Sequence, residues 1–202
     1  MMRGRERYCT HAALLALSFG TSVHAYAQTP VPAPESARGH APSGALQSPP
    51  LCVEVIDGRR FRDIETQIVY RLYGIDACEP DQIARLGRQS WPCGTMAKAW
   101  LVTATLNKWV ACNVLRQNEG EHLARCASAD HADIAGDMIR DGVAVTSGPA
   151  ERDPGIRAYA AAETDARKAY RGLWSSSFLM PWDYREETRH RAAAAPVTGA
   201  NP

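Results

Sequence analysis

Alternation of apolar and polar positions predicts β-strands in the first half of the chain. Residues 51–57 alternate and meet Gly58, which indicates a strand followed by a turn, and residues 61–64 suit a short partner strand. Residues 67–73 are rich in β-branched and aromatic side chains and give the strongest strand prediction. Two further strands are predicted over 109–115 and 122–127, on either side of a hairpin signal at 117–120.

Helical periodicity is confined to three later segments. Residues 95–106 place apolar side chains on one face, as do 133–141, and 156–171 form an Ala-rich run that ends at Gly172. Residues 78–94 contain two prolines and two glycines and are predicted to be a long loop. Strands that come first and helices that follow favour an α+β fold with a small closed sheet over a doubly wound one.

The two ends of the chain lack the pattern of a folded core. Residues 1–27 combine an Arg-rich start, a short apolar run and small residues before Gln28, which predicts a cleaved secretory signal rather than a membrane span. Residues 28–50 hold six prolines and predict a disordered linker. The tail at 186–202 is expected to be disordered as well. The working domain is therefore expected at 51–185.

Composition narrows the function classes. Of the 202 residues, 45% are hydrophobic and 22% charged, which excludes a wholly disordered or fibrous chain. Lys and Arg number 23 against 22 Asp and Glu, and loss of the signal leaves a net charge of about −1. A general electrostatic attraction to nucleic acid is therefore excluded, and any phosphate chemistry must come from a local site.

A series of motifs in fixed order resembles the staphylococcal nuclease (thermonuclease) family, in its secreted bacterial branch. The resemblance begins with Val-Ile-Asp-Gly at 55–58 and Tyr-Arg-Leu-Tyr-Gly-Ile-Asp-Ala-Cys-Glu at 70–79. Further matches follow at 91–94, 110–112, 124–126, 141–144, Tyr159 with Glu163 and Ala166, 172–174, Pro181, Trp182 and Arg185. The resemblance covers nearly all of 51–185 and implies a five-stranded OB-type barrel with three helices.

Three residues at the end of the best strand suit phosphodiester hydrolysis. This reaction needs a metal held by carboxylates, a base for water and cations on the phosphoryl oxygens. The resemblance implies these roles for Arg71 as a catalytic phosphate-binding residue, Asp76 as a metal ligand and Glu79 as the catalytic general base.

Two further family positions are reversed in charge. The family turn reads Asp-Gly-Asp-Thr, but residues 57–60 read Asp-Gly-Arg-Arg, so Asp57 remains as a weak candidate ligand while Arg59 stands at a lost one. A guanidinium has no lone pair to offer a cation. In the hairpin, Glu121 occupies the position of the second catalytic arginine. Loss of one such cation commonly costs about 10²–10³ in rate.

These reversals suggest an internal ion-pair network, in which Arg59 pairs with Asp76 or Glu79 and Glu121 pairs with Arg71. The first functional hypothesis is an exported binding or structural module with a decayed nuclease site or trace phosphodiesterase activity, with no cofactor. The alternative is an active Ca²⁺-dependent nuclease with a rearranged site. The expected partner is a nucleic acid or nucleotide, and the expected state is a periplasmic or secreted monomer.

Five cysteines remain after the predicted signal. Cys112 and Cys126 flank the hairpin symmetrically and would face each other as a disulfide. Secreted members of the family usually carry a cysteine just beyond the acidic motif, and this resemblance implies that Cys78 takes over the pairing with Cys93. Cys52 is then left unpaired, either as a buried strand residue or for an intermolecular bridge.

Overall fold

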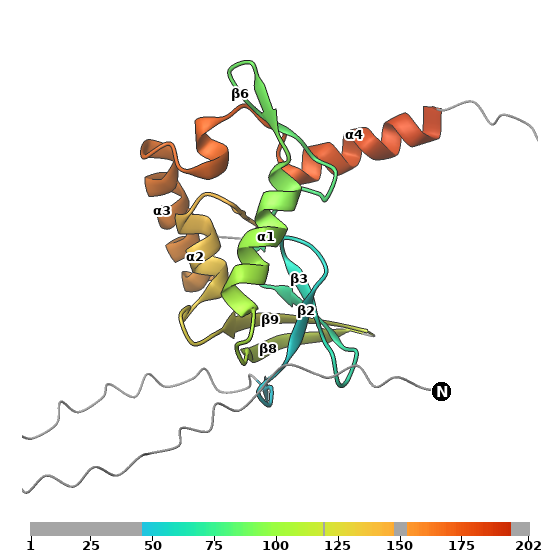
Figure 1. Ribbon diagram of the computed structural model, residues 1–202, viewed down its shortest axis with the longest axis vertical. Coiled ribbons are helices and arrows are strands. Elements are labelled where there is room, and N and C mark those ends of the chain that lie inside the picture. The colour runs from blue at the N-terminus through green and yellow to red at the C-terminus, as the bar shows by residue number, and fades with distance from the viewer. Residues whose placement is uncertain (1–45, 119, 148–152, 195–202) are drawn as a thin grey trace, which may run out of the picture.

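A computed structural model describes residues 46–118, 120–147 and 153–194 of an α+β domain (Figure 1). Its main sheet has six strands in the order β1-β8-β9-β4-β3-β2. These strands are β1 (Leu46–Gln47), β2 (Val53–Val55), β3 (Arg60–Asp63), β4 (Val69–Leu72), β8 (Ala111–Asn118) and β9 (Glu121–Ala127). Two small sheets pair β5 (Ile75–Asp76) with β10 (Val145–Thr146) and β6 (Ala84–Leu86) with β7 (Gln89–Trp91).

The centre of the main sheet is a parallel pair. β4 runs parallel to β9, with Val69 opposite Glu121 and Arg71 opposite Leu123, and every other neighbour in this sheet is antiparallel. Gly120 has a φ of 75° in the predicted hairpin turn between β8 and β9, a conformation that favours glycine. The strand predictions over 51–73 and 109–127 are therefore confirmed, with β2 and β4 shorter than predicted and β8 and β9 each one residue longer.

Strand pairing among the described residues forms no closed barrel. The two edge strands, β1 and β2, do not pair with each other. One isolated antiparallel bridge, between Leu51 and Val110, links the segment before β2 to the segment before β8 through hydrogen bonds of 2.8 and 3.0 Å. Because β2 has only three residues, this single bridge takes the place of a paired strand between the two ends of the sheet. The α+β class is observed, and the predicted five-stranded closed barrel is not.

Four α-helices are present in the described residues, rather than the three expected: α1 (Cys93–Thr105), α2 (Ile134–Arg140), α3 (Pro154–Lys168) and α4 (Pro181–Ala194). Asp133 and Asp153 accept hydrogen bonds from the first backbone amides of α2 and α3, which fixes where these helices begin. The first three helices lie together beside the sheet (Figure 1). Apolar side chains from α1, α2, α3 and the strands form one buried core. No described helix has the length and apolar character needed to cross a bilayer.

Parts of both segments predicted to be disordered form regular structure in the described residues. Leu46 and Gln47, within the predicted linker at 28–50, pair with β8 as β1. Residues 186–194, within the predicted tail, continue α4, supported by an ion pair 3.4 Å long between Glu187 and Arg191, one turn apart. The predicted signal at 1–27 lies outside the described residues. The expected loop at 78–94 contains the β6–β7 hairpin, which turns at Gly87 with a φ of 59°.

Two disulfides join the predicted pairs. Cys112 and Cys126 lie directly opposite on β8 and β9 with Cα atoms 4.1 Å apart, and Cys78 and Cys93 are linked with Cα atoms 5.8 Å apart. Both pairings are confirmed. The expectation that Cys52 is unpaired is wrong, because Cys52 is disulfide-bonded too.

Removal of the Cys78–Cys93 disulfide should lower the free energy of unfolding by about 3 kcal/mol, because the bond closes a loop with a sequence separation of 15. Denaturant titration of the Cys78→Ala/Cys93→Ala double variant measures this loss. The single Cys78→Ala variant is the control and should lose a similar amount, because either change removes the bond. A loss under about 1 kcal/mol would contradict the prediction.

Candidate active site: two carboxylates bound by two arginines

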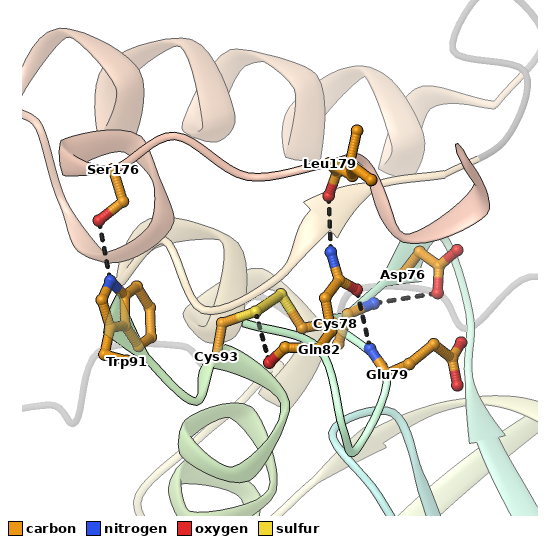
Figure 2. Close-up of a disulfide and its surroundings, with 9 residues drawn as sticks. Asp76, Cys78, Glu79, Gln82, Trp91, Cys93, Ser176 and Leu179 are labelled. Atoms are coloured by element: carbon orange, nitrogen blue, oxygen red, sulfur yellow. Dashed lines mark hydrogen bonds between the residues drawn. A yellow bond between two sulfur atoms is a disulfide. The ribbon is translucent and has the colours of Figure 1, made fainter. Parts of the chain in front are cut away.

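Asp76 and Glu79 are positioned by the chain that leaves β5. Asp76 is only 2% exposed, because β5 pairs with β10 there, opposite Val145. Its Oδ1 also accepts a hydrogen bond of 3.0 Å from the amide of Ala77. The amide of Glu79 donates to Oε1 of Gln82 over 3.0 Å, which fixes the backbone at Glu79 (Figure 2). The two carboxylates therefore stand on a well-defined turn.

The start of α1 packs directly against this turn. Gly94 lies so close to the carbonyl of Glu79 that a Cβ at position 94 would overlap it. The disulfide between Cys78 and Cys93 joins the neighbouring residues of the two segments (Figure 2). A glycine and a disulfide at successive positions thus fix the backbone of Glu79 to the first turn of α1.

Arg59 reaches the carboxylates from the turn between β2 and β3. Asp57 shapes this turn by accepting the amide of Arg59 over 3.0 Å and the Nε of Arg60 over 2.8 Å. The Arg59 guanidinium then pairs with Asp76 through Nη1 and with Oε1 of Glu79 through Nη2, at 3.0 Å. The sequence predicted one of these two partners, and the structure provides both.

Arg185 completes the cluster from the first turn of α4. Its Nη2 lies 2.6 Å from Oδ2 of Asp76, and its Nη1 lies 2.7 Å from Oε1 of Glu79. Sequence reasoning missed this role, although Arg185 belongs to the matched motifs. The available signal was its place just after Pro181 and Trp182, but a separation of 106 residues from Glu79 gave no reason to connect the two.

The charges of the cluster balance. Burial alone raises the pKa of Asp76, but hydrogen bonds from Arg185 and the charges of Arg59 and Arg185 outweigh it, so the pKa of this carboxyl lies below its usual range. The hydrogen bond to Asp76 raises the pKa of Arg185 against its own burial, with a further contribution from Glu79. Asp76 is therefore ionised, and Arg59 and Arg185 lie against Asp76 and Glu79 as two permanent cations.

This arrangement does not fit a Ca²⁺ ion. Ca²⁺ requires six to eight oxygen ligands, and both oxygens of Asp76 are bound by guanidinium groups. Both oxygens of Asp57 accept hydrogen bonds from its own turn. Among the described residues, no group of three or more His, Cys, Asp or Glu side chains is placed to bind a metal. The carboxylates of the candidate ligands Asp57 and Asp76 are therefore already bound by arginine side chains and a backbone amide.

Arg71 and Glu121 lie outside the cluster. Arg71 has a buried Nε without a hydrogen-bond partner in the described chain, and it lines a groove of about 280 Å³ together with Arg116 and Ser147. The expected ion pair between Arg71 and Glu121 is not among the ion pairs of the described residues. In the parallel register Glu121 lies opposite Val69, two residues or about 7 Å along the strand from Arg71.

The fold is therefore an α+β domain, and its candidate site is an acidic pair bound by two arginines. The family model described as "Staphylococcal nuclease homologue" matches residues 69–176, more than half of the chain, and the chain belongs to this family. A curated relative, the "Probable endonuclease LCL3" of Schizophyllum commune (strain H4-8 / FGSC 9210), is 28% identical over 147 residues. That match covers 66% of this chain and 49% of the relative, so the chain spans about half of the relative's length.

Proposed function

We propose that this protein keeps the nuclease fold without metal-dependent hydrolysis, and binds a phosphate-bearing ligand such as a nucleic acid or nucleotide. One observation carries the proposal: both oxygens of Asp76 are bound by the guanidinium groups of Arg59 and Arg185. A nuclease of this family would place a metal ion where these two cations stand. In this proposal the protein has lost the hydrolysis that the family suggests and keeps the binding of the phosphate-bearing ligand.

The electrostatics support this proposal. A divalent cation at Asp76 would lie beside two guanidinium groups, and each unit-charge pair costs about 4 kcal/mol at 4 Å with an effective dielectric of 20. Asp76 and Glu79 carry two negative charges, and Arg59 and Arg185 already neutralise them. The cluster therefore offers a dication no net attraction.

The groove beside Arg71 supplies the binding part of the proposal. Two arginines, Arg71 and Arg116, line one groove together with Ser147. Guanidinium groups bind phosphate oxygens through paired N–H donors. The unpartnered Nε of Arg71 is a donor that a phosphate would satisfy. Glu121 would disfavour the negative charge that develops during hydrolysis, but it is not among the residues that line this groove.

The proposed location is the periplasm or the exterior of the cell, where the protein acts as a monomer. The two disulfides described above suit an oxidising compartment. The Arg-rich, apolar start of the chain has the composition of an export signal.

A Ca²⁺ titration followed by thermal unfolding tests the metal half of the proposal. Addition of Ca²⁺ should leave the Tm of the unmodified protein unchanged. A ligand that binds the folded state raises the Tm, and the proposal expects no Ca²⁺ to bind. Cleavage of DNA and RNA should stay at background with and without Ca²⁺. Ca²⁺-dependent cleavage that is lost on Glu79→Gln would establish the alternative, an active nuclease with a rearranged site.

Fluorescence anisotropy with a labelled oligonucleotide tests the binding half. Arg71→Ala should weaken binding about tenfold, the effect of one charge-assisted contact of about 1.4 kcal/mol. Arg191→Ala is the matched control, since it removes an arginine that is 73% exposed on α4, outside the groove, and should leave affinity unchanged. Equal effects of the two changes would refute a specific groove.

A further inference from the structure

A rigid platform, formed by residues 83–91 and 177–179, stands apart from the site. Backbone hydrogen bonds of 2.9 Å join Arg85 and Ser177 in both directions. Trp91 donates its Nε1–H to Ser176 over 2.9 Å, and Gln82 donates to the carbonyl of Leu179 over 2.7 Å (Figure 2). The Cys78–Cys93 disulfide lies at the base of this assembly (Figure 2). The platform is therefore preformed and needs no ordering on contact.

The outer surface of the platform is apolar. Ile83 is 49% exposed, Leu86 53% and Leu179 41%. Ile83 and Leu179 also line an open groove of about 660 Å³, with Phe178 in its wall and Arg85 at its edge. Three large exposed aliphatic side chains on one rigid element mark an interaction surface rather than the isolated exposure that most proteins show.

The charge of the platform has a single sign. Between Gln82 and Pro92 the charged residues are Arg85 and Arg88, both exposed, and residues 175–182 carry no charge. The exposed Asp81 lies just outside the platform, where it adds to burial in raising the pKa of Tyr184 on α4. An occupant must therefore offer apolar contact together with negative charge.

We propose that the platform docks on an anionic lipid bilayer. Aliphatic side chains enter the boundary between headgroups and acyl chains, while guanidinium groups contact lipid phosphates. The β6–β7 hairpin projects at the end of the domain opposite the main sheet, where a flat surface can reach it (Figure 1). A second copy of the chain suits the platform less well, because a symmetric contact would place the same positive charges, Arg85 and Arg88, on both sides of one interface.

Co-sedimentation with vesicles tests this proposal. The probe is a vesicle of phosphatidylethanolamine and phosphatidylglycerol, and the comparison is a vesicle of phosphatidylcholine. Every variant is made in the full-length chain. We expect binding to the anionic vesicles only. Arg85→Ala/Arg88→Ala should weaken partitioning about 30-fold, from the typical surface attraction of two arginines. Ile83→Ser/Leu86→Ser should weaken it at least about tenfold through lost apolar contact.

Leu106→Ser is the matched control, because Leu106 is 61% exposed at the end of α1, outside the platform. This variant should bind vesicles as the unmodified protein does, and all variants should keep its Tm. Equal binding to both vesicle types, or equal loss in Leu106→Ser and Ile83→Ser/Leu86→Ser, would overturn the proposal. A dimer in lipid-free solution that dissociates on Ile83→Ser/Leu86→Ser would instead assign the platform to a second copy.

Discussion

Arg59→Asp combined with Glu121→Arg should produce Ca²⁺-dependent phosphodiesterase activity at least about 10²-fold above that of Arg59→Asp alone. The first change removes a cation from Asp76 and Glu79 and adds a third carboxylate, which is the ligand type that Ca²⁺ prefers. The second change returns a cation where the family carries its second catalytic arginine. Arg59→Asp alone should restore some Ca²⁺ binding with little activity, because metal and phosphate cation stabilise different parts of the transition state.

Rates of cleavage of a fluorescent oligonucleotide, with Ca²⁺ and with chelator, measure this gain. Glu79→Gln in the double-variant background is the control and should return the rate to background. Adding Arg185→Met should strengthen Ca²⁺ binding further, because Arg185 still occupies both carboxylates in the double variant. Activity in the unmodified protein equal to that of the double variant would show that the reversed charges are not the barrier.

Arg59→Met combined with Arg185→Met should lower the free energy of unfolding by about 3–5 kcal/mol, the usual effect of leaving a buried charge without its partner. Asp76 is 2% exposed, so water cannot replace the two guanidinium groups. Chemical denaturation measures the loss. Adding Asp76→Asn to this double variant should recover part of the stability, because the buried charge is then removed together with its partners. A double variant as stable as the unmodified protein would contradict the ion-pair cluster.

The pH dependence of stability follows from the same cluster. The pKa of Asp76 is lower in the folded protein than its ordinary value of about 3.9. A carboxyl with a depressed folded pKa adds stability above its unfolded pKa and loses it as pH falls through the folded pKa. The contribution of Asp76 should therefore be constant from about pH 5 upward, decline progressively below about pH 4, and be lost once the pH has fallen through the lower folded pKa. Asp76→Asn should flatten this acid limb.

Local patterns were sufficient to predict most elements of the domain. The β-branched run that became β4, the hairpin at Gly120 and the Ala-rich α3 each follow from neighbours in sequence. The long loop was mispredicted because the three-residue strands β6 and β7 are too short for a period of two to show. α4 was missed because it buries only Pro181 among its described side chains, so it leaves no apolar stripe.

The sequence by itself determined the family motifs, the charge reversals at Arg59 and Glu121, and the Cys112–Cys126 pairing, because residue identity and short spacing are enough to define them. The Cys78–Cys93 pairing was implied by the family resemblance. Only the tertiary structure decided which charges meet. It joined Arg185 to Asp76 across a separation of 109 residues, and it placed Glu121 opposite Val69 rather than opposite Arg71 through the register of β4 and β9. Contacts between distant segments depend on strand register and helix placement, and the sum of all packing interactions sets these. A single sequence therefore gives the charges of this site, while the fold assigns their partners.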